Sequence, residues 1–269
     1  MKKLLGIILG MSFLLPGVST KALTNISGRN SGLSAVSAKA EESISEAALP
    51  SESDPLHTDK TVTADSVNLQ LNAKAAYMMD WASGTEIYSS NATDRLPIAS
   101  MCKIMTLILC FDAIEAGNLS LDEMISVSEH AASMGGSQVF LEANAQYPAR
   151  ELIKSIIVCS ANDSCVAMAE RIAGSDTLFT DKMNARAKEL GAENTLFANC
   201  TGLPKEPQYS CAHDVAKMLA ELVSHEEYFS FSKIWMDKFQ HPQGRYTEIS
   251  NTNRLVRFYE GCDGGKTGF

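Results

Sequence analysis

The residue types most able to do chemistry together are Ser100 and Lys103, in the sequence Ser-Met-Cys-Lys. Residues three apart share one face of a helix, so we expect the lysine amine beside the serine hydroxyl. A serine hydroxyl becomes an effective nucleophile when an adjacent base takes its proton, and a lysine can be that base. The pair therefore predicts nucleophilic catalysis by a lysine-activated serine.

The surroundings of this pair favour a buried helix over residues 100–114. Apart from Ser100, Lys103, Thr106 and Asp112, every residue of this stretch is apolar. A buried lysine must be paired or lose its proton, and a neutral lysine is a base. The alternative is a chance occurrence of a short motif, with Lys103 reaching the surface or pairing with a carboxylate.

Two further short motifs follow along the chain, Ser160-Ala161-Asn162 and Lys266-Thr267-Gly268. The first lies where one predicted helix ends and another begins, a place where short polar side chains can project into a cleft. The alternative is that Ser160 and Asn162 only cap a helix. Glycines flank the Lys266-Thr267 pair, which suits a strand that a ligand backbone passes closely.

The three motifs occur in the order typical of penicillin-binding proteins and class A β-lactamases. With the surrounding sequences ASMCKIMT, CSANDSCVAMAE, FANCTGLP and GCDGGKTGF, the chain resembles the low-molecular-mass penicillin-binding proteins, the serine D-alanyl-D-alanine carboxypeptidases of bacterial cell walls. The resemblance covers residues 68–269. It implies an α/β (α+β) sandwich of the β-lactamase/transpeptidase type, in which an antiparallel sheet packs on helices and a mostly helical subdomain follows the first hairpin.

The resemblance also implies a role for each motif residue. Ser100 would attack the carbonyl between two terminal D-alanines and form an acyl-enzyme, with Lys103 as the base. Ser160 would relay a proton to the leaving amine, and Asn162 would hold the substrate amide.

The remaining implied roles belong to the end of the chain. Lys266, Thr267 and Gly268 would bind the free carboxylate of the last D-alanine. The backbone N–H groups of Ser100 and Phe269 would form the oxyanion hole. The expected partners are peptidoglycan pentapeptide stems, with β-lactam antibiotics as inhibitors, and no cofactor or metal is expected.

Composition and patterning predict three segments. Residues 1–22 have the charged start and short apolar run of a signal peptide, residues 23–68 read as a disordered linker, and residues 69–269 form the catalytic domain. We therefore expect export to the outer face of the cytoplasmic membrane, the periplasm or the cell wall. A net charge of -9 argues against a nucleic-acid partner.

The catalytic domain is expected to be truncated, because related proteins continue beyond the Lys-Thr-Gly motif with further strands. Many also carry a C-terminal β-domain and an amphipathic membrane anchor, so membrane association is expected only through a C-terminal part absent here. A Lys-Thr-Gly strand without a neighbour would leave an exposed sheet edge. We expect the product that ends at Phe269 to be unstable or poorly active.

Local patterns predict the elements that position these motifs. We expect a hairpin over 73–79 and 85–89, loops with short elements over 118–148, a strand over 246–250, and helices over 100–114, 152–157, 163–172, 176–190 and 213–223. The seven cysteines do not form an even, clustered framework, so Cys102, Cys110, Cys159 and Cys165 are expected to pack as small apolar groups. The five histidines show no metal-ligand spacing.

Two other functions stay open. A class A β-lactamase needs a further general-base glutamate, but Glu193 and Glu206 lack the expected E-x-x-L-N context, and Glu142 precedes the second motif. The second alternative is a catalytically silent protein that binds cell wall or β-lactams. Turnover would distinguish this protein from an enzyme.

Overall fold

The computed structural model describes residues 6–10 and 69–269. The predicted linker over 23–68 and most of the predicted signal peptide therefore lie outside the described residues. Residues 6–10 and 70–269 belong to one compact unit.

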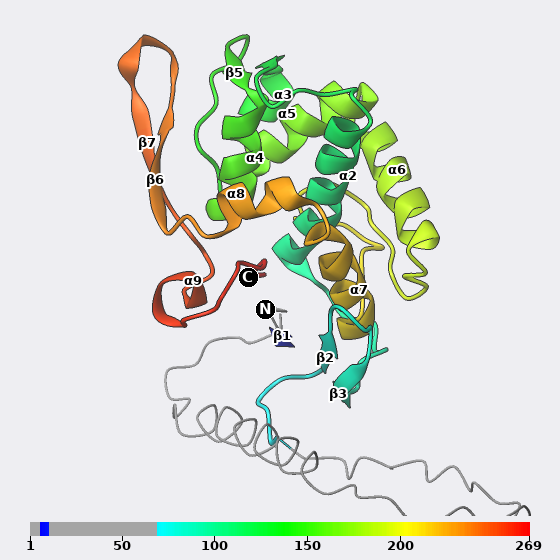
Figure 1. The fold of residues 1–269 in the computed structure, drawn as a ribbon. Helices are drawn as coiled ribbons and strands as arrows, with labels where there is room; N and C mark the ends of the chain where they lie inside the picture. Colours follow the sequence, from blue (N-terminus) through cyan, green and yellow to red (C-terminus); the bar gives the residue numbers. More distant parts are fainter. Residues whose placement is uncertain (1–5, 11–68) are drawn as a thin grey trace, which may run out of the picture. The chain divides into compact units, whose positions relative to one another are not determined.

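The N-terminal sheet contains β1 (Gly6–Gly10), β2 (Ala76–Asp80) and β3 (Glu86–Ser90) in the order β1-β2-β3 (Figure 1). The antiparallel pairing of β2 with β3 confirms the predicted hairpin. Its turn is held by Asp80 Oδ1, which accepts hydrogen bonds from the backbone N–H and the hydroxyl of Ser83.

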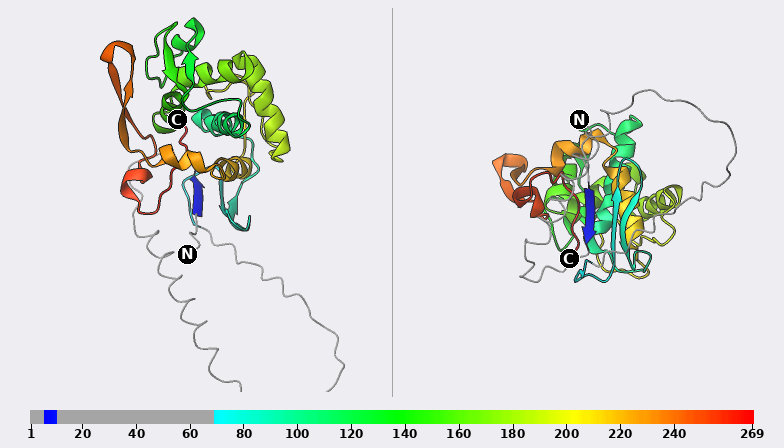
Figure 2. Two further views of the ribbon diagram at one scale, coloured as in Figure 1. Left: turned by 45° about the horizontal axis from the view of Figure 1, so that its top comes forward. Right: turned by 60° about the horizontal axis from the view of Figure 1, so that its bottom comes forward.

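The other edge of β2 pairs antiparallel with β1 (Figure 2). Sequence patterning did not predict this strand, because the apolar segment that contains it reads as a leader. An open sheet edge carries unpaired backbone N–H and C=O groups, and an apolar segment can satisfy them. The signal-peptide function of residues 1–22 stays a prediction.

The largest apolar core surrounds a central helix, α2 (Lys103–Glu115). It packs against α4 (Ala149–Val158), α5 (Asn162–Ala173), α6 (Asp176–Glu189) and α7 (Ala212–Leu222) (Figure 1). Six apolar side chains of α2 are at most 1% exposed: Ile104, Met105, Leu107, Ile108, Cys110 and Phe111. Full burial of such a side chain stabilises a fold by roughly 1.5–3 kcal/mol. The predicted buried helix is confirmed, although a 3-10 turn, η1 (Ala99–Cys102), forms its first residues.

Helix α7 lies between α2 and the N-terminal sheet. Its Ala212 and Ala216 are buried with Ala75 and Tyr77 in a second small core cluster. The antiparallel sheet thus packs on helices, which confirms the α+β arrangement that the resemblance implies.

Short elements occupy the rest of the unit. β4 (Met124–Ser126) pairs with β5 (Gln146–Pro148), and α3 (Glu129–Ala132) lies between them in sequence. A second hairpin is formed by β6 (Met236–Gln240) and β7 (Tyr246–Ser250). The remaining short turns are η2 (Glu226–Tyr228), α8 (Phe229–Ser232), η3 (Pro242–Gly244) and α9 (Leu255–Phe258). In the part of the chain that the structure describes, no helix is long and apolar enough to cross a bilayer.

The predicted strand at the Lys-Thr-Gly motif is wrong for this structure. Residues 260–269 have no strand, although the backbone near Gly264 and Gly265 is held in place. Asn253 donates a hydrogen bond to the Gly264 carbonyl, and Gly265 N–H donates one to the Tyr228 hydroxyl. Side chains, and not a neighbouring described strand, therefore satisfy this backbone.

Candidate active site

The first motif lies at the junction of η1 and α2. Lys103 Nζ donates hydrogen bonds to Ser100 Oγ at 3.1 Å and to the Thr201 carbonyl at 2.5 Å. The Lys103 side chain is 0% exposed. Both of these acceptors are uncharged, so the buried ammonium is hydrogen-bonded without a carboxylate partner among its described contacts. This is the geometry that a serine nucleophile and its base require.

The backbone around Ser100 depends on a close approach from a distant loop. Ala99 has a φ of 45°, in the left-handed region that side chains other than glycine rarely adopt. A Cβ atom at Gly202 would lie 2.0 Å from the Ala99 carbonyl oxygen. Asn199 Oδ1 accepts hydrogen bonds from the N–H groups of Thr201 and Gly202, which closes this loop on itself.

Sequence reasoning missed the parts played by Asn199, Thr201 and Gly202. The loop sequence FANCTGLP supported only the resemblance, and nothing in it indicated that a backbone carbonyl contacts Lys103. The available signal was the asparagine three residues before a glycine, because such an asparagine commonly closes a turn through its side chain.

The second motif occupies the turn between α4 and α5. Ser160 has a φ of 64° and is 3% exposed. Its Oγ is buried, with no hydrogen-bond partner among the described residues. Asn162 Nδ2 donates to the Gly135 carbonyl at 2.7 Å. The N-cap of α5 is Ala161 and has no side-chain cap, so the capping interpretation of Ser160 and Asn162 is wrong.

The third motif contacts the turn that carries the first. A Cβ atom at Gly268 would lie 2.8 Å from the Ile98 carbonyl oxygen and 3.5 Å from Met101 Cγ. Thr267 Oγ1 donates to Thr252 Oγ1 at 2.8 Å. The first and third motifs, which are far apart in sequence, therefore lie side by side.

Lys266 gives this region a second buried amine. It is 8% exposed and its Nζ donates to the Thr267 carbonyl at 3.2 Å. Burial first, and then the charge of Lys103, lower the pKa of Lys266 to about 7.

Asp163 supports the second motif in a way that the sequence did not indicate. Its fully buried carboxylate accepts hydrogen bonds from the N–H groups of Val139, Leu141 and Ser164. Burial raises the pKa of this carboxyl. The loop that carries Gly135, the acceptor for Asn162, is thus tied to the start of α5.

Comparison with known proteins places this geometry in a family. The family model for peptidase S11, D-alanyl-D-alanine carboxypeptidase, matches residues 59–269.

The chain belongs to this family.

Curated S11 relatives include D-alanyl-D-alanine carboxypeptidase DacF of Bacillus subtilis, 44% identical over 197 residues, which are 73% of this chain and 51% of the relative. DacC of Escherichia coli is 36% identical over 226 residues, which are 78% of this chain and 52% of that protein. The chain therefore spans about half the length of these curated relatives.

Solved structures agree on the S11 fold. DacD from Francisella tularensis superposes with a TM-score of 0.71 and 32% identity, covering 76% of this chain and 61% of that one. Penicillin-binding protein 5 from Haemophilus influenzae gives a TM-score of 0.68 and 30% identity, covering 74% and 58%.

The glutamates considered for a β-lactamase are either exposed or ion-paired. Glu193 and Glu206 are exposed. Glu142 forms an ion pair with Arg245 at 2.9 Å. All seven cysteines are free thiols, and burial raises the pKa of the Cys102 thiol to about 12, as expected for a packing group.

Proposed function

We propose that this chain is the catalytic part of a serine D-alanyl-D-alanine carboxypeptidase that removes the terminal D-alanine from peptidoglycan stem peptides. The observation that carries this proposal is the 3.1 Å contact between Lys103 Nζ and Ser100 Oγ on a turn that also contacts Gly268. Membership of the S11 family supports it.

In the proposed reaction, Lys103 accepts the Ser100 proton while Oγ forms a bond to the carbonyl carbon of the penultimate D-alanine. The N–H groups of Ser100 and Phe269 stabilise the oxyanion. The C–N bond then breaks as Ser160 gives its hydroxyl proton to the leaving amine and takes up the proton that Lys103 removed from Ser100. Water hydrolyses the resulting ester and regenerates the Ser100 hydroxyl.

The other motif residues hold the substrate in this proposal. Protonated Lys266 and the Thr267 hydroxyl bind the terminal carboxylate, while Gly268 lets the substrate chain approach the nucleophile. Asn162 binds the substrate amide. The low pKa of Lys266 supports this role, because binding of a carboxylate restores its charge.

A β-lactam would acylate Ser100 in the same way, and slow hydrolysis of that ester would make it an inhibitor. We also infer that residues 1–22 direct export, which would place the enzyme outside the cytoplasmic membrane, where its substrate lies. These inferences rest on the sequence patterns and the family.

The decisive experiment measures intact-protein mass after brief exposure to a penicillin, together with D-alanine release from a peptide ending in D-Ala-D-Ala. We expect one adduct per chain and D-alanine release, both lost in Ser100→Ala and retained in Ser83→Ala, which alters an exposed turn. An adduct without release would favour the silent binding protein. No adduct on the wild-type chain would contradict the proposal.

A further inference from the structure

A cluster of charged side chains lies at the end of α2 that is remote from Lys103. Asp112 and Glu115 come from the last turns of α2, Glu221 from α7, and His225 from the loop after α7. We call these four residues the His225 cluster. Its components come from separate elements, and no residue of the proposed active site belongs to it.

The hydrogen bonding of His225 leaves one ring nitrogen without a partner. His225 Nδ1 lies 2.6 Å from Glu115 Oε1, and an ionised carboxylate only accepts, so Nδ1 carries a proton. His225 Nε2 is buried and has no hydrogen-bond partner among the described residues. It faces Asp112 Oδ1 at 3.6 Å. A neutral Nε2 that faces a carboxylate oxygen opposes two lone pairs, and either a proton or a metal ion between the two atoms would relieve that opposition.

The charges around the cluster also favour a cation. Arg186 pairs with Asp112 through Nε at 3.0 Å, and its Nη2 binds Glu221. Glu189 lies 3.4 Å from Arg186 Nη1. The Arg186 guanidinium therefore faces three carboxylates. Glu115, which contacts His225, adds a fourth carboxylate to the cluster's surroundings.

We propose that the His225 cluster binds a divalent transition-metal ion of the Zn²⁺ class. His225 Nε2 and one carboxylate oxygen each from Asp112 and Glu221 would be the ligands, and these atoms all lie within 4.8 Å of one another. Zinc accepts imidazole and carboxylate ligands at about 2.0–2.2 Å, so a small inward movement would close the site. Water would complete the coordination, because Asp112 and Glu221 are partly exposed.

The surrounding groups hydrogen-bond to the proposed ligands, as the residues around a metal site usually do. Glu115 holds Nδ1–H and so directs the Nε2 lone pair inward, as in carboxylate–histidine–zinc arrangements. Arg186 orients Asp112 and Glu221. The bound ion would join α2, α7 and the following loop, which makes its role structural.

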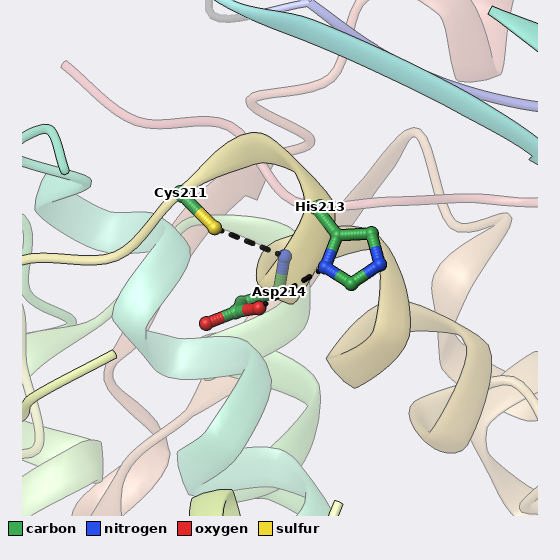
Figure 3. Close-up of side chains that lie close together, drawn as sticks. All are labelled: Cys211, His213 and Asp214. Carbon is green, nitrogen blue, oxygen red and sulfur yellow. Dashed lines mark hydrogen bonds and ion pairs between the residues drawn. The ribbon is translucent and has the colours of Figure 1, made fainter. Parts of the chain in front are cut away.

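A second group of possible ligands provides a control. Cys211, His213 and Asp214 also approach within 4.8 Å of one another at the start of α7. Figure 3 shows that the Cys211 thiol already accepts the Asp214 N–H and that His213 contacts the Asp214 carboxylate. The other Asp214 oxygen accepts from Asn194 N–H and Thr195 Oγ1. No buried atom of this group lacks a partner, so it is not expected to bind zinc.

The test titrates the chelator-treated 269-residue protein with Zn²⁺ by calorimetry and follows its thermal unfolding. We expect one saturable site per chain, a higher Tm with Zn²⁺, and no comparable rise with Mg²⁺ or Ca²⁺, which prefer all-oxygen sites. Co²⁺ substitution should show no thiolate charge-transfer band, because no cysteine is a ligand.

Variants assign the site. His225→Gln should abolish Zn²⁺ binding, Glu115→Ala should weaken it by about 10–100-fold, and His213→Gln should leave it unchanged. If His225→Gln does not fold, Glu221→Gln must give the same loss. No saturable Zn²⁺ binding to the wild-type protein would overturn the proposal and indicate that a proton on His225 supplies the charge. Binding retained in the folded His225→Gln variant, or a cobalt–thiolate band, would also overturn it.

Discussion

The two ends of α2 place different groups around a buried basic side chain. At the N-terminal end, Lys103 is bound by a hydroxyl and a backbone carbonyl, both uncharged. At the C-terminal end, His225 lies against the carboxylates of Asp112 and Glu115. Carboxylates stabilise a cation held beside them, whereas a hydroxyl and a carbonyl bring no negative charge. The same helix can thus present a reactive base at one end and a cation site at the other.

The largest expected effect is the loss of acylation when Lys103, which has no carboxylate partner among its described contacts, is replaced. Lys103→Met retains an apolar stem of similar length in the core, so the fold should persist while the general base is lost. We expect acylation by penicillin to slow by about 10²–10⁴-fold. The measurement is the rate of adduct formation by mass spectrometry.

Lys154 is the matched control for that change. It is also buried, but it pairs with Glu151 at 2.8 Å and Asp237 at 2.7 Å. Lys154→Met should leave acylation within a few-fold of wild type, although two carboxylates lose their partner. Equal slowing by both variants would show that any buried lysine, paired or not, supports the site indirectly.

The next largest effect is expected in the loop whose Thr201 carbonyl accepts a hydrogen bond from Lys103. Gly202→Ala would force a Cβ against the Ala99 carbonyl at a φ of 81°. We expect a loss of about 3 kcal/mol in the free energy of unfolding, together with slower acylation.

Gly117→Ala measures the cost of backbone strain alone, without the close contact that a Cβ at Gly202 would make with Ala99. Gly117 has a φ of 71° and open space around it, so only the left-handed conformation is penalised, by about 1–2 kcal/mol. Denaturant unfolding of both variants gives the difference. Similar losses at the two positions would mean that the approach of Gly202 to Ala99 is not tight.

A pH series examines the second amine of the site. The pKa of Lys266 is about 7, so its protonated fraction falls up to tenfold per pH unit above that value. The KM for a peptide with a free C-terminal carboxylate should rise accordingly. A matched peptide amide should show no such rise, and a KM independent of pH for the acid would contradict the proposed role of Lys266.

The same pKa predicts that folding stability increases over the pH range in which substrate binding weakens. Between about 7 and 10.5 the unfolded chain holds a proton on Lys266 that the folded chain lacks, so folding stability should rise with pH across this window. Below pH 7 both states are protonated and the full cost of burying the charge is present. Lys266→Met should remove this part of the pH dependence in denaturant unfolding.

The smallest effect is expected at the carboxylate-rich end of α2. The Glu115 side chain is 63% exposed, so in metal-free protein Glu115→Gln should change the free energy of unfolding by less than about 1 kcal/mol. Acylation of Ser100 should not change. A large effect on acylation would mean that the two ends of the helix are coupled.

The elements with strong local patterns were predictable from the sequence. The β2–β3 hairpin, the buried α2 and the strand Tyr246–Ser250 follow from apolar periodicity and turn residues. The partner strand β6 was missed because its two apolar residues, Met236 and Phe239, are three apart and so do not follow the period of two that indicates a strand.

The sequence by itself determined the identity, order and chemical types of the three motifs, because motif residues are read directly from the chain. The contact between Ser100 and Lys103 was also predictable, because residues three positions apart lie on one face of a helical turn.

Tertiary structure alone decided which distant groups complete these sites. The Thr201 carbonyl on Lys103, the passage of Gly268 along Ile98, and the partners of His225 all join residues far apart in the chain. Such contacts depend on how helices pack around α2, and local propensity contains no information about that packing. For the same reason, the glycines suggested a strand at Lys266, but a strand also needs a pairing partner, which local patterns do not reveal.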